Sequence, residues 1–512
     1  MKSAVFLLSV FWLALPARAQ EIAPGKILVR YRVPRAIRGA VRLGSHSARA
    51  LRRVGATELF SVPGAGPSEI AALAARLAND PDVAWAEPDY VRHRLGAGVA
   101  PNDPRYPDQW ALPMIRAPQA WSRTTGSTAV TVAVLDSGVL PHPDLAARLQ
   151  GGYDFVSDPQ NGGDGDGRDA DPTDPGDSTE ASSALHGLHV AGILGAIANN
   201  GLGVTGLDWS CRVEPVRVLG VNAGTGVDSD IADAIRWAAG LSVDGVPDNP
   251  NPAQVINLSF GGAGLSQTMQ AAVSDAIAQG VTVVAAAGNL GIDAAGDSPA
   301  ALDGVITVGA VDPTGQRASY SNYGPVVALM APGGLMMNDD SGHSEGVLST
   351  MELPGVGFTY VYLAGTSQAT PFVAGAVALM KAVYPSMTPA EARKLLQLSA
   401  DPIARCADPD DPTKAGCGAG LLDVDAALVL AATEADCTPA CGDGLLCSAG
   451  QCVSATSLGG PGTVDNVTIG GCTASGAGSS RGGAGALVLL ALLLVASRAS
   501  IRYKSRDAQD HL

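Results

Sequence analysis

Between about Pro101 and Ala432, the sequence alternates short, continuously apolar runs with helical patterns, and this alternation most limits the possible fold. The clearest run is Val130–Leu135, which ends at Asp136. Strands that are apolar throughout must be covered on both faces, so we expect a three-layer α/β domain around a mainly parallel sheet, with its active site at the carboxyl ends of the strands. Further runs are Val213–Leu219, Gln254–Ser259, Val281–Ala287 and Val305–Ala310, and helical patterns include Ile231–Ala239 and Met269–Gln279.

Three local motifs carry the candidate chemistry. Asp136 stands in Asp-Ser-Gly at the end of a strand, where its carboxylate can accept an imidazole N–H. His186 opens a Gly/Ala-rich apolar helix in the motif His-Gly-Leu-His. Ser367 lies in Gly-Thr-Ser-Gln-Ala-Thr-Pro, where backbone N–H groups at a helix start favour negative charge, and Pro371 is expected in the first helical turn. Each motif alone is common, but their order and context together are specific.

Together these motifs resemble those of the subtilase family of serine peptidases, and the likeness covers the N-terminal leader and the central domain. The resemblance implies that Asp136 orients the histidine, that His186 is the general base and then acid, and that Ser367 is the nucleophile. Leu188 departs from the family pattern, which usually has Thr there. We expect His189 to have a structural, hydrogen-bonded role.

The resemblance also assigns residues around the catalytic centre. Ala-Ala-Ala-Gly-Asn, ending at Asn289, is similar to the family's oxyanion segment, although Gly-Asn is also a common turn pair. An extended substrate is expected to bind as an added strand. Asp293 or Asp297 is a candidate for favouring a basic P1 residue. The expected substrate-binding residues are Ser259, Phe260 and Gly261 on one wall of the S1 pocket, Ala287 and Gly288 on the other, and Gly226 in a partner strand.

Two candidate calcium sites follow from acidic and amide side chains. The chain has 49 acidic and 33 basic residues, which leaves oxygen ligands for a hard cation. Asp144 and Asn200 match positions where many subtilases bind a stabilising calcium. An Asp/Gly-rich loop resembles a calcium loop of some bacterial relatives, with a solvated surface loop as the alternative. Its candidate ligands are Asp164, Asp166, Asp169 and Asp171.

The N-terminus predicts export, and the cysteines predict disulfides. Lys2, the apolar run Val5–Leu15 and the small-x-small site at residues 17–19 together form a secretory signal. In an oxidising compartment, we expect a Cys406–Cys417 bridge, while Cys211 is expected to be a buried free thiol. Two more bridges, of open connectivity, are expected in a cluster for which a metal knuckle is the less favoured alternative. The cluster comprises Cys437, Cys441, Cys447 and Cys452.

The chain divides into seven predicted parts. Residues 21–95 carry 12 basic and 7 acidic side chains, and this leader resembles the subtilase propeptide, a chaperone and transient inhibitor. Gly471-Cys472, before an apolar run and a basic tail, resembles a myxobacterial C-terminal sorting signal and indicates membrane anchoring. The parts are a signal peptide (1–19), a propeptide (20–98), a catalytic domain (99–432), a Cys-rich segment (433–453), a Gly/Ser-rich spacer (454–481), an apolar membrane or sorting helix (482–497) and a basic cytoplasmic-type tail (498–512).

The resemblance therefore implies a secreted, monomeric serine endopeptidase that acts on proteins and peptides and matures by propeptide removal. The net charge of −16 argues against a nucleic-acid partner. Two other classes remain open: a catalytically inactive adhesion or scaffold protein on the same fold, and a zinc hydrolase using His186 and His189. The zinc alternative lacks a Glu at the usual metalloprotease spacing.

Overall fold

The computed structural model describes residues 22–33, 39–90, 98–176, 185–335, 345–402, 416–435, 445–448 and 451–454. The predicted signal peptide, apolar segment 482–497 and basic tail lie outside these residues, as do Cys406, Cys437, Cys441 and Cys472. Within the described ranges, no helix is long and apolar enough to cross a membrane.

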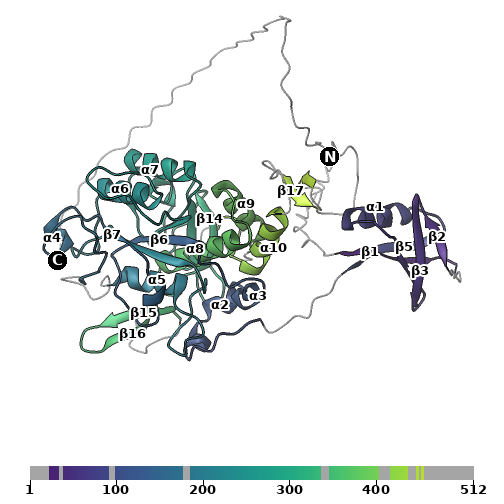
Figure 1. The fold of residues 1–512 in the computed structure, drawn as a ribbon, viewed down its shortest axis with the longest axis horizontal. Helices are drawn as coiled ribbons and strands as arrows, with labels where there is room; N and C mark the ends of the chain where they lie inside the picture. Colours follow the sequence, from purple (N-terminus) through teal and green to yellow (C-terminus); the bar gives the residue numbers. More distant parts are fainter. Residues whose placement is uncertain are drawn as a thin grey trace, which may run out of the picture. The chain divides into compact units, whose positions relative to one another are not determined.

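Residues 22–90 form an antiparallel sheet covered by one helix (Figure 1). The helix buries Ile70 and Leu73 against Ile27 and Phe60. It begins at Pro67, and Glu69 accepts a hydrogen bond from the N–H of the preceding Gly66. In spatial order, the strands are β2 (Ala40–Leu43), β3 (His46–Val54), β4 (Thr57–Ser61), β1 (Ile22–Tyr31) and β5 (Val83–Tyr90), and the helix is α1 (Pro67–Leu77).

The central region is built on a seven-stranded sheet in which every neighbouring pair is parallel. All five strands expected from apolar runs are present, which confirms the predicted fold class. Two further strands at the sheet edges were not predicted: one is only two residues long, and the other is a short apolar run flanked by Pro and Gly. In spatial order, the strands are β14 (Val327–Pro332), β13 (Ile306–Val311), β11 (Thr282–Ala286), β9 (Val255–Leu258), β6 (Thr131–Asp136), β8 (Arg212–Arg217) and β7 (Tyr153–Asp154).

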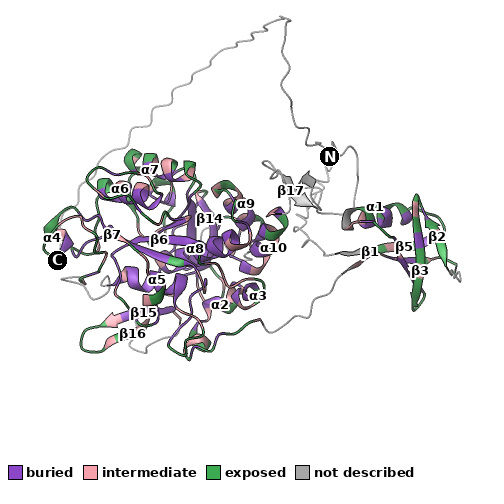
Figure 2. Ribbon diagram, viewed as in Figure 1, coloured by how far each residue is buried: buried purple, intermediate pink, exposed green. Residues whose placement is uncertain are grey.

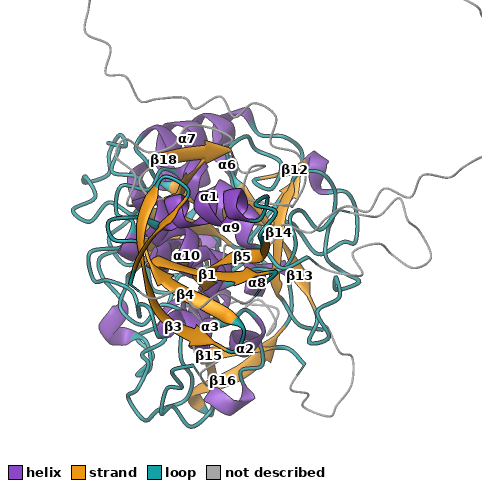
Figure 3. Cartoon of the chain, turned by 90° about the vertical axis from the view of Figure 1, so that its right-hand side faces the viewer, coloured by secondary structure: helices purple, strands orange, loops and turns teal. Residues whose placement is uncertain are grey.

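Helices cover both faces of this sheet, and the central strands are buried (Figure 2). Val132 and Val134 of β6 belong to the core on one face, whereas Ala133 and Leu135 belong to the core on the other. The first face is covered by α2 (Ala111–Met114), α3 (Ala117–Trp121), α5 (His186–Gly195), α8 (Thr366–Val383), α9 (Pro389–Ser399) and α10 (Val424–Ala435). The second is covered by α6 (Asp228–Ala238) and α7 (Gln267–Ala278), which lie side by side (Figures 1 and 3).

Short elements surround this frame. A hairpin of β15 and β16 leads directly into α8 and lies away from α6 and α7 in both views (Figures 1 and 3). Within the predicted Cys-rich segment, Cys447 and Cys452 occupy paired positions on two antiparallel strands. The short elements are α4 (Pro159–Gly162), β10 (Gly262–Ala263), β12 (Asp297–Ser298), β15 (Val347–Leu353), β16 (Gly357–Leu363), β17 (Leu445–Ser448) and β18 (Gln451–Ser454).

Two cysteines of the central region behave differently. Cys211 is free and fully buried in the core beside α5, as predicted. Cys417 is buried and disulfide-bonded. Because Cys406 lies outside the described residues, its pairing with Cys417 stays a prediction.

A buried carboxyl group lies near the start of β8. Glu214 is fully buried; its Oε2 accepts a hydrogen bond from Asn249 Nδ2 (3.0 Å), while Oε1 has no hydrogen-bond partner among the described residues. Burial raises the pKa of Glu214 from 4.5 to about 8. The folded protein therefore holds this carboxyl neutral at pH values where an unfolded chain ionises it.

We predict that the free energy of unfolding of Glu214→Gln, relative to that of the parent protein, increases as the pH rises from 5 to 8. In the parent protein, unfolding releases the Glu214 proton over this range, so the free energy of unfolding falls by up to about 1.4 kcal/mol per pH unit. The amide has no proton to release. Thermal unfolding of both proteins at pH 5 and pH 8 measures the effect, and an equal gap at both values would contradict it.

Candidate active site

Asp136 and His186 meet at the carboxyl end of β6. Asp136 is the last residue of β6 and is fully buried, and His186 is the half-buried first residue of α5. His186 Nδ1 lies 2.8 Å from Asp136 Oδ1. Because a carboxylate only accepts hydrogen bonds, Nδ1 carries the proton and Nε2 presents a lone pair. This pair can therefore accept a proton at Nε2 while the carboxylate holds the ring.

The turn that follows β6 also fixes the start of α5. Ser137 Oγ accepts a hydrogen bond from the Gly187 N–H (2.9 Å). A Cβ on Gly187 would overlap the Gly138 carbonyl, so only glycine permits this close approach of the turn and the helix. The Asp-Ser-Gly and His-Gly motifs thus pack directly against each other, and this contact positions Asp136 beside His186.

Ser367 is tied to the end of β9 by a reciprocal pair of hydrogen bonds. Ser367 Oγ donates to the Ser259 carbonyl (2.8 Å), and Ser259 Oγ donates to the Ser367 carbonyl (2.9 Å). Asn257 Nδ2 in turn donates to Ser259 Oγ (2.9 Å). Ser367 is the second residue of α8, so its side chain stands at the positive end of an 18-residue helix.

The position of Pro371 explains why Ser259 is needed there. We expected Pro371 in the first turn of its helix, but α8 begins at Thr366 and Pro371 lies inside it. Proline has no N–H, so the carbonyl four residues earlier, that of Ser367, loses its helical donor. The Ser259 hydroxyl replaces that donor.

Asn289 is oriented by Thr366, which sequence reasoning did not single out. Asn289 Oδ1 accepts hydrogen bonds from the Thr366 N–H (2.8 Å) and from Thr366 Oγ1 (2.9 Å). Thr366 Oγ1 also accepts from the Gly288 N–H (3.1 Å). A backbone N–H can only donate, so Oδ1 faces Thr366 and the opposite side of the amide presents Nδ2 as a donor. Asn289 is exposed, so this donor can reach a bound molecule.

The predicted substrate residues divide between two places. Gly226, Phe260 and Gly261 line a pocket of about 390 Å³, together with Leu219, Ile231, Met269 and Ser298 among others. Ser259, Ala287 and Gly288 instead lie at the ends of β9 and β11. Gly224 lies in a turn, and residues 225–227 belong to no helix or strand. The strand predicted around Gly226 would pair with a bound peptide, so it stays a prediction.

The two acidic residues considered for a basic P1 side chain both have hydrogen-bond partners within the protein. Asp293 Oδ1 accepts from the Ala295 N–H (2.9 Å), and Asp297 Oδ2 accepts from Asn322 Nδ2 (3.2 Å). Asp293 therefore stabilises its own loop, whereas Asp297 contacts the segment that leads into β14.

His189 has the expected structural role. It is fully buried, and its Nε2 lies 3.1 Å from the Val361 carbonyl of β16. Burial lowers the pKa of His189 to about 3, so the ring stays neutral. His189 thus ties α5 to the hairpin that precedes Ser367.

The first candidate calcium site brings its two predicted residues into contact. Asn200 Nδ2 donates to Asp144 Oδ1 (2.6 Å), and the Val204 N–H donates to Asp144 Oδ2 (3.0 Å). Burial, with a smaller contribution from the nearby carboxylate of buried Asp103, raises the pKa of Asp144 to about 6. Neither carboxylate forms an ion pair with any described side chain.

In the second candidate site, the four aspartates have different partners. Asp164 forms an ion pair with buried Arg217 (2.5 Å), while Asp169 and Asp171 accept backbone N–H groups of their own loop. The carboxylate of Asp169 raises the pKa of exposed Asp166. Across the described ranges, no three His, Cys, Asp or Glu residues form a group that could hold a metal ion.

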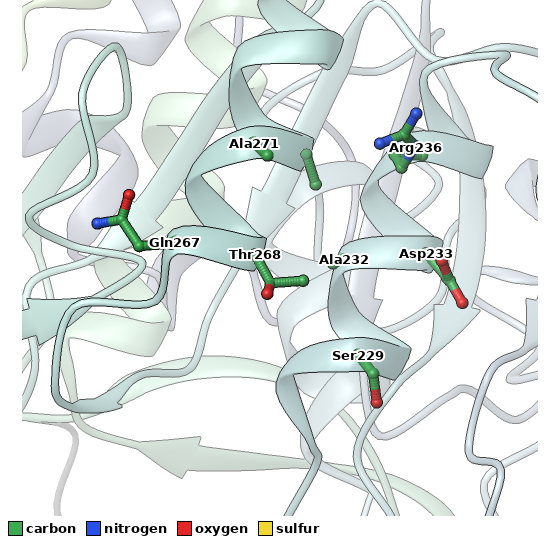
Figure 4. A pocket seen from close by; sticks show the side chains of 8 residues that line it. Ser229, Ala232, Asp233, Arg236, Gln267, Thr268 and Ala271 are labelled. Carbon is green, nitrogen blue, oxygen red and sulfur yellow. The ribbon is translucent and has the colours of Figure 1, made fainter.

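A separate surface hollow of about 440 Å³ lies between α6 and α7 (Figure 4). Arg236, Asp233 and Ser229 of α6 and Gln267 and Thr268 of α7 line it. None of the predicted site residues contributes to this hollow, so it is distinct from the catalytic constellation.

Comparison with known proteins gives consistent matches. A model of the subtilase family matches residues 127–422. An extracellular protease of Xanthomonas campestris pv. campestris is 40% identical, over 71% of this chain and 62% of its own length. An extracellular basic protease of Dichelobacter nodosus is 36% identical, over 72% of this chain and 62% of its own length. The chain thus spans less than two thirds of the length of these two relatives.

Among solved structures, a protease of Pseudoalteromonas arctica is similar in sequence and fold. It is 43% identical to this chain, and the match covers 65% of this chain and 100% of the other, with a TM-score of 0.61. The matched fold agrees with the parallel sheet and its two helical layers.

We predict that Ser259→Ala lowers the free energy of unfolding by about 1 kcal/mol, because it leaves the partly buried Ser367 carbonyl without a donor. Replacing Pro371 by Ala returns an N–H to that carbonyl. Ser259→Ala should therefore cost less in a Pro371→Ala background than in the parent protein. Urea unfolding of the four proteins measures this difference, and equal costs in the two backgrounds would refute the explanation.

Proposed function

Because the chain belongs to the subtilase family, we propose that it is a secreted serine endopeptidase that hydrolyses peptide bonds through an acyl-enzyme on Ser367. The observation that carries this proposal is the 2.8 Å contact between His186 Nδ1 and Asp136 Oδ1 beside the Ser367 helix. The names of the two curated relatives, both extracellular proteases, support the same activity and compartment.

In the proposed reaction, Ser367 Oγ attacks the carbonyl carbon of the scissile bond. His186 Nε2 takes the hydroxyl proton, and Asp136 stabilises the imidazolium that forms. The Ser367 hydroxyl leaves the Ser259 carbonyl and turns toward His186 for this step. His186 then gives its proton to the leaving amine, and a water molecule repeats the sequence to release the acid and restore Ser367.

Two donors stabilise the tetrahedral oxyanion in this proposal. One is Asn289 Nδ2, whose amide is oriented by Thr366. The other is the Ser367 N–H, one of the N–H groups that lack a helical acceptor at the start of α8. Removal of one such donor costs roughly 10²- to 10³-fold in kcat.

The substrate is proposed to run along Gly226 and residues 259–261, with an apolar side chain in the pocket that Gly226, Phe260 and Gly261 line. The P1 side chain is proposed to bind at a separate place, between residues 259–261 on one side and Ala287 and Gly288 on the other. Glycines in this cleft leave main-chain groups accessible for pairing with an extended peptide. Specificity is therefore expected to be broad, with apolar side chains preferred.

The parts of the chain outside the central domain complete the proposal. Residues 22–90 resemble a propeptide that acts as a transient inhibitor, and processing is expected between Tyr90 and Pro101. Export by the N-terminal signal and anchoring by residues 482–497 rest on the sequence alone. We retain them as the expected route to the cell exterior or the cell surface.

We predict that Ser367→Ala abolishes casein hydrolysis and propeptide removal, with kcat reduced by about 10⁶-fold because the nucleophile is lost. His186→Ala should lose activity to a similar extent. Casein digestion and the mass of the purified chain measure both effects. Equal digestion by the parent protein and Ser367→Ala would exclude Ser367 as the nucleophile, and no digestion by either would favour the inactive scaffold alternative.

Calcium is proposed as a structural ion at Asp144 and Asn200. Asp103 and Asp144 are buried acids without an ion pair among the described residues, and a cation would offset their charge. Asn200 would contribute its amide oxygen after rotation of the amide group. The loop of Asp164, Asp166, Asp169 and Asp171 is a second candidate, in which Asp164 is already balanced by Arg217.

We predict that calcium raises the melting temperature of the Ser367→Ala protein, because an ion bound only by the folded state stabilises it. At 100 times the Kd, the gain is about 2.7 kcal/mol. Asp144→Asn should remove most of this gain, whereas Asp166→Asn, in the other loop, should not. Equal melting temperatures in calcium and in chelator would refute a structural calcium ion.

A further inference from the structure

Loop 287–292, which contains Asn289, forms hydrogen bonds with one buried side chain, that of Asn322. Asn322 is 1% exposed and lies in the segment that leads into β14. Its Oδ1 accepts from the Leu290 N–H (3.0 Å) and the Ile292 N–H (3.1 Å). Its Nδ2 donates to the Ala287 carbonyl (2.9 Å). These contacts bracket Asn289 on both sides along the chain.

The amide orientation of Asn322 follows from its partners. Two backbone N–H groups require an acceptor at Oδ1, and the Ala287 carbonyl requires a donor at Nδ2. The second Nδ2 proton points to Asp297 Oδ2 (3.2 Å). The side chain thus accepts two hydrogen bonds from loop 287–292 and donates one to the same loop and one to Asp297. Aspartate, which has the same shape, lacks the two donor protons.

The backbone brings Asn322 unusually close to this loop. The Asn322 N–H donates to the Gly288 carbonyl (2.9 Å), and the Tyr323 N–H donates to the Ile292 carbonyl (2.9 Å). Gly288 has a φ of +102°, and a Cβ there would overlap Asn322 Nδ2. Gly288 therefore permits both the turn and the approach of Asn322.

We propose that Asn322 is a positioning residue for the oxyanion donor Asn289, an inference that rests on the proposed function. Thr366 orients the Asn289 side chain by donating to its Oδ1. Asn322 holds the main chain on both sides of Asn289 through hydrogen bonds to Ala287 and Leu290. Asn322 itself is buried and touches no substrate. Its role is to keep Asn289 Nδ2 at the distance at which it donates to the transition state.

This role predicts a particular kinetic signature. Oxyanion donors must lie about 2.7–3.1 Å from the developing charge, and a misplacement of about 1 Å from a remote change can cost roughly 100-fold in rate. The loss falls on kcat, because the oxyanion forms only in the transition state. KM, which reflects binding along the cleft, is expected to change little.

The test compares Asn322→Ala with Asn249→Ala, a matched change at a buried asparagine that contacts Glu214 instead of the loop. Rates of hydrolysis of a chromogenic peptide are divided by the concentration of active sites, which is titrated with a phosphonyl fluoride. This normalisation excludes unfolded protein. Asn322→Ala should lower kcat per site roughly 10- to 100-fold with KM within about threefold. Asn249→Ala should leave kcat per site unchanged.

Two further variants separate positioning from general damage. In an Asn289→Ala background, Asn322→Ala should cost at most about twofold more, because its effect passes through Asn289. Asn322→Asp keeps the acceptors but repels Asp297. Adding Asp297→Asn to Asn322→Asp should therefore recover part of kcat, and this pair replaces Asn322→Ala if that variant does not fold.

Unchanged kcat per site in Asn322→Ala, or losses that multiply fully with those of Asn289→Ala, would overturn the inference. The same outcome follows if Asn322→Asp gains nothing from Asp297→Asn. None of these results would contradict the proposed function. That proposal fails only if the parent protein has no peptidase activity or if Ser367→Ala retains peptidase activity.

Discussion

The site depends on the register of the parallel strands β6, β9 and β11, because this register places their carboxyl ends side by side. Leu135 of β6 and Ala285 of β11 both pair with Leu258 of β9. Asp136 and Ser259 therefore follow at the same level, and the loop with Asn289 begins two residues after Ala285. Helices α5 and α8 start at this edge, which adds His186 and Ser367. No single element contains the site; the sheet assembles it.

Around these strand ends, buried polar side chains replace hydrogen bonds that the backbone alone cannot make. Ser259 serves the carbonyl that Pro371 leaves unpaired, Thr366 holds the Asn289 amide, and Asn322 holds loop 287–292. Each has partners in a different segment of the chain, so the loss of one affects more than one catalytic group. Buried polar groups are costly unless they are fully paired, and here their pairing coincides with the geometry that hydrolysis requires.

The sequence was sufficient for the fold class, and its motifs singled out Asp136 and His186, which the structure brings into contact. Apolar runs gave the strands that carry Asp136, Ser259 and Asn289, because continuous burial leaves a pattern along the chain. The prediction placed Pro371 in the first turn of its helix, whereas Pro371 lies inside α8. The helix tolerates this proline because the Ser259 hydroxyl, far away in the sequence, donates to the carbonyl that the proline leaves unpaired. Asn322 left no signal at all: its importance lies in contacts with residues about 30 positions earlier, which no local pattern encodes.

In the proposed reaction, Ser367 is the nucleophile and His186 activates it. Tandem mass spectrometry of the protein after reaction with a phosphonyl fluoride tests this most directly, because the reagent marks an activated serine covalently. The expected result is a single modified residue, Ser367, and loss of the modification in His186→Ala. Modification of another serine such as Ser259, or equal labelling without His186, would contradict it.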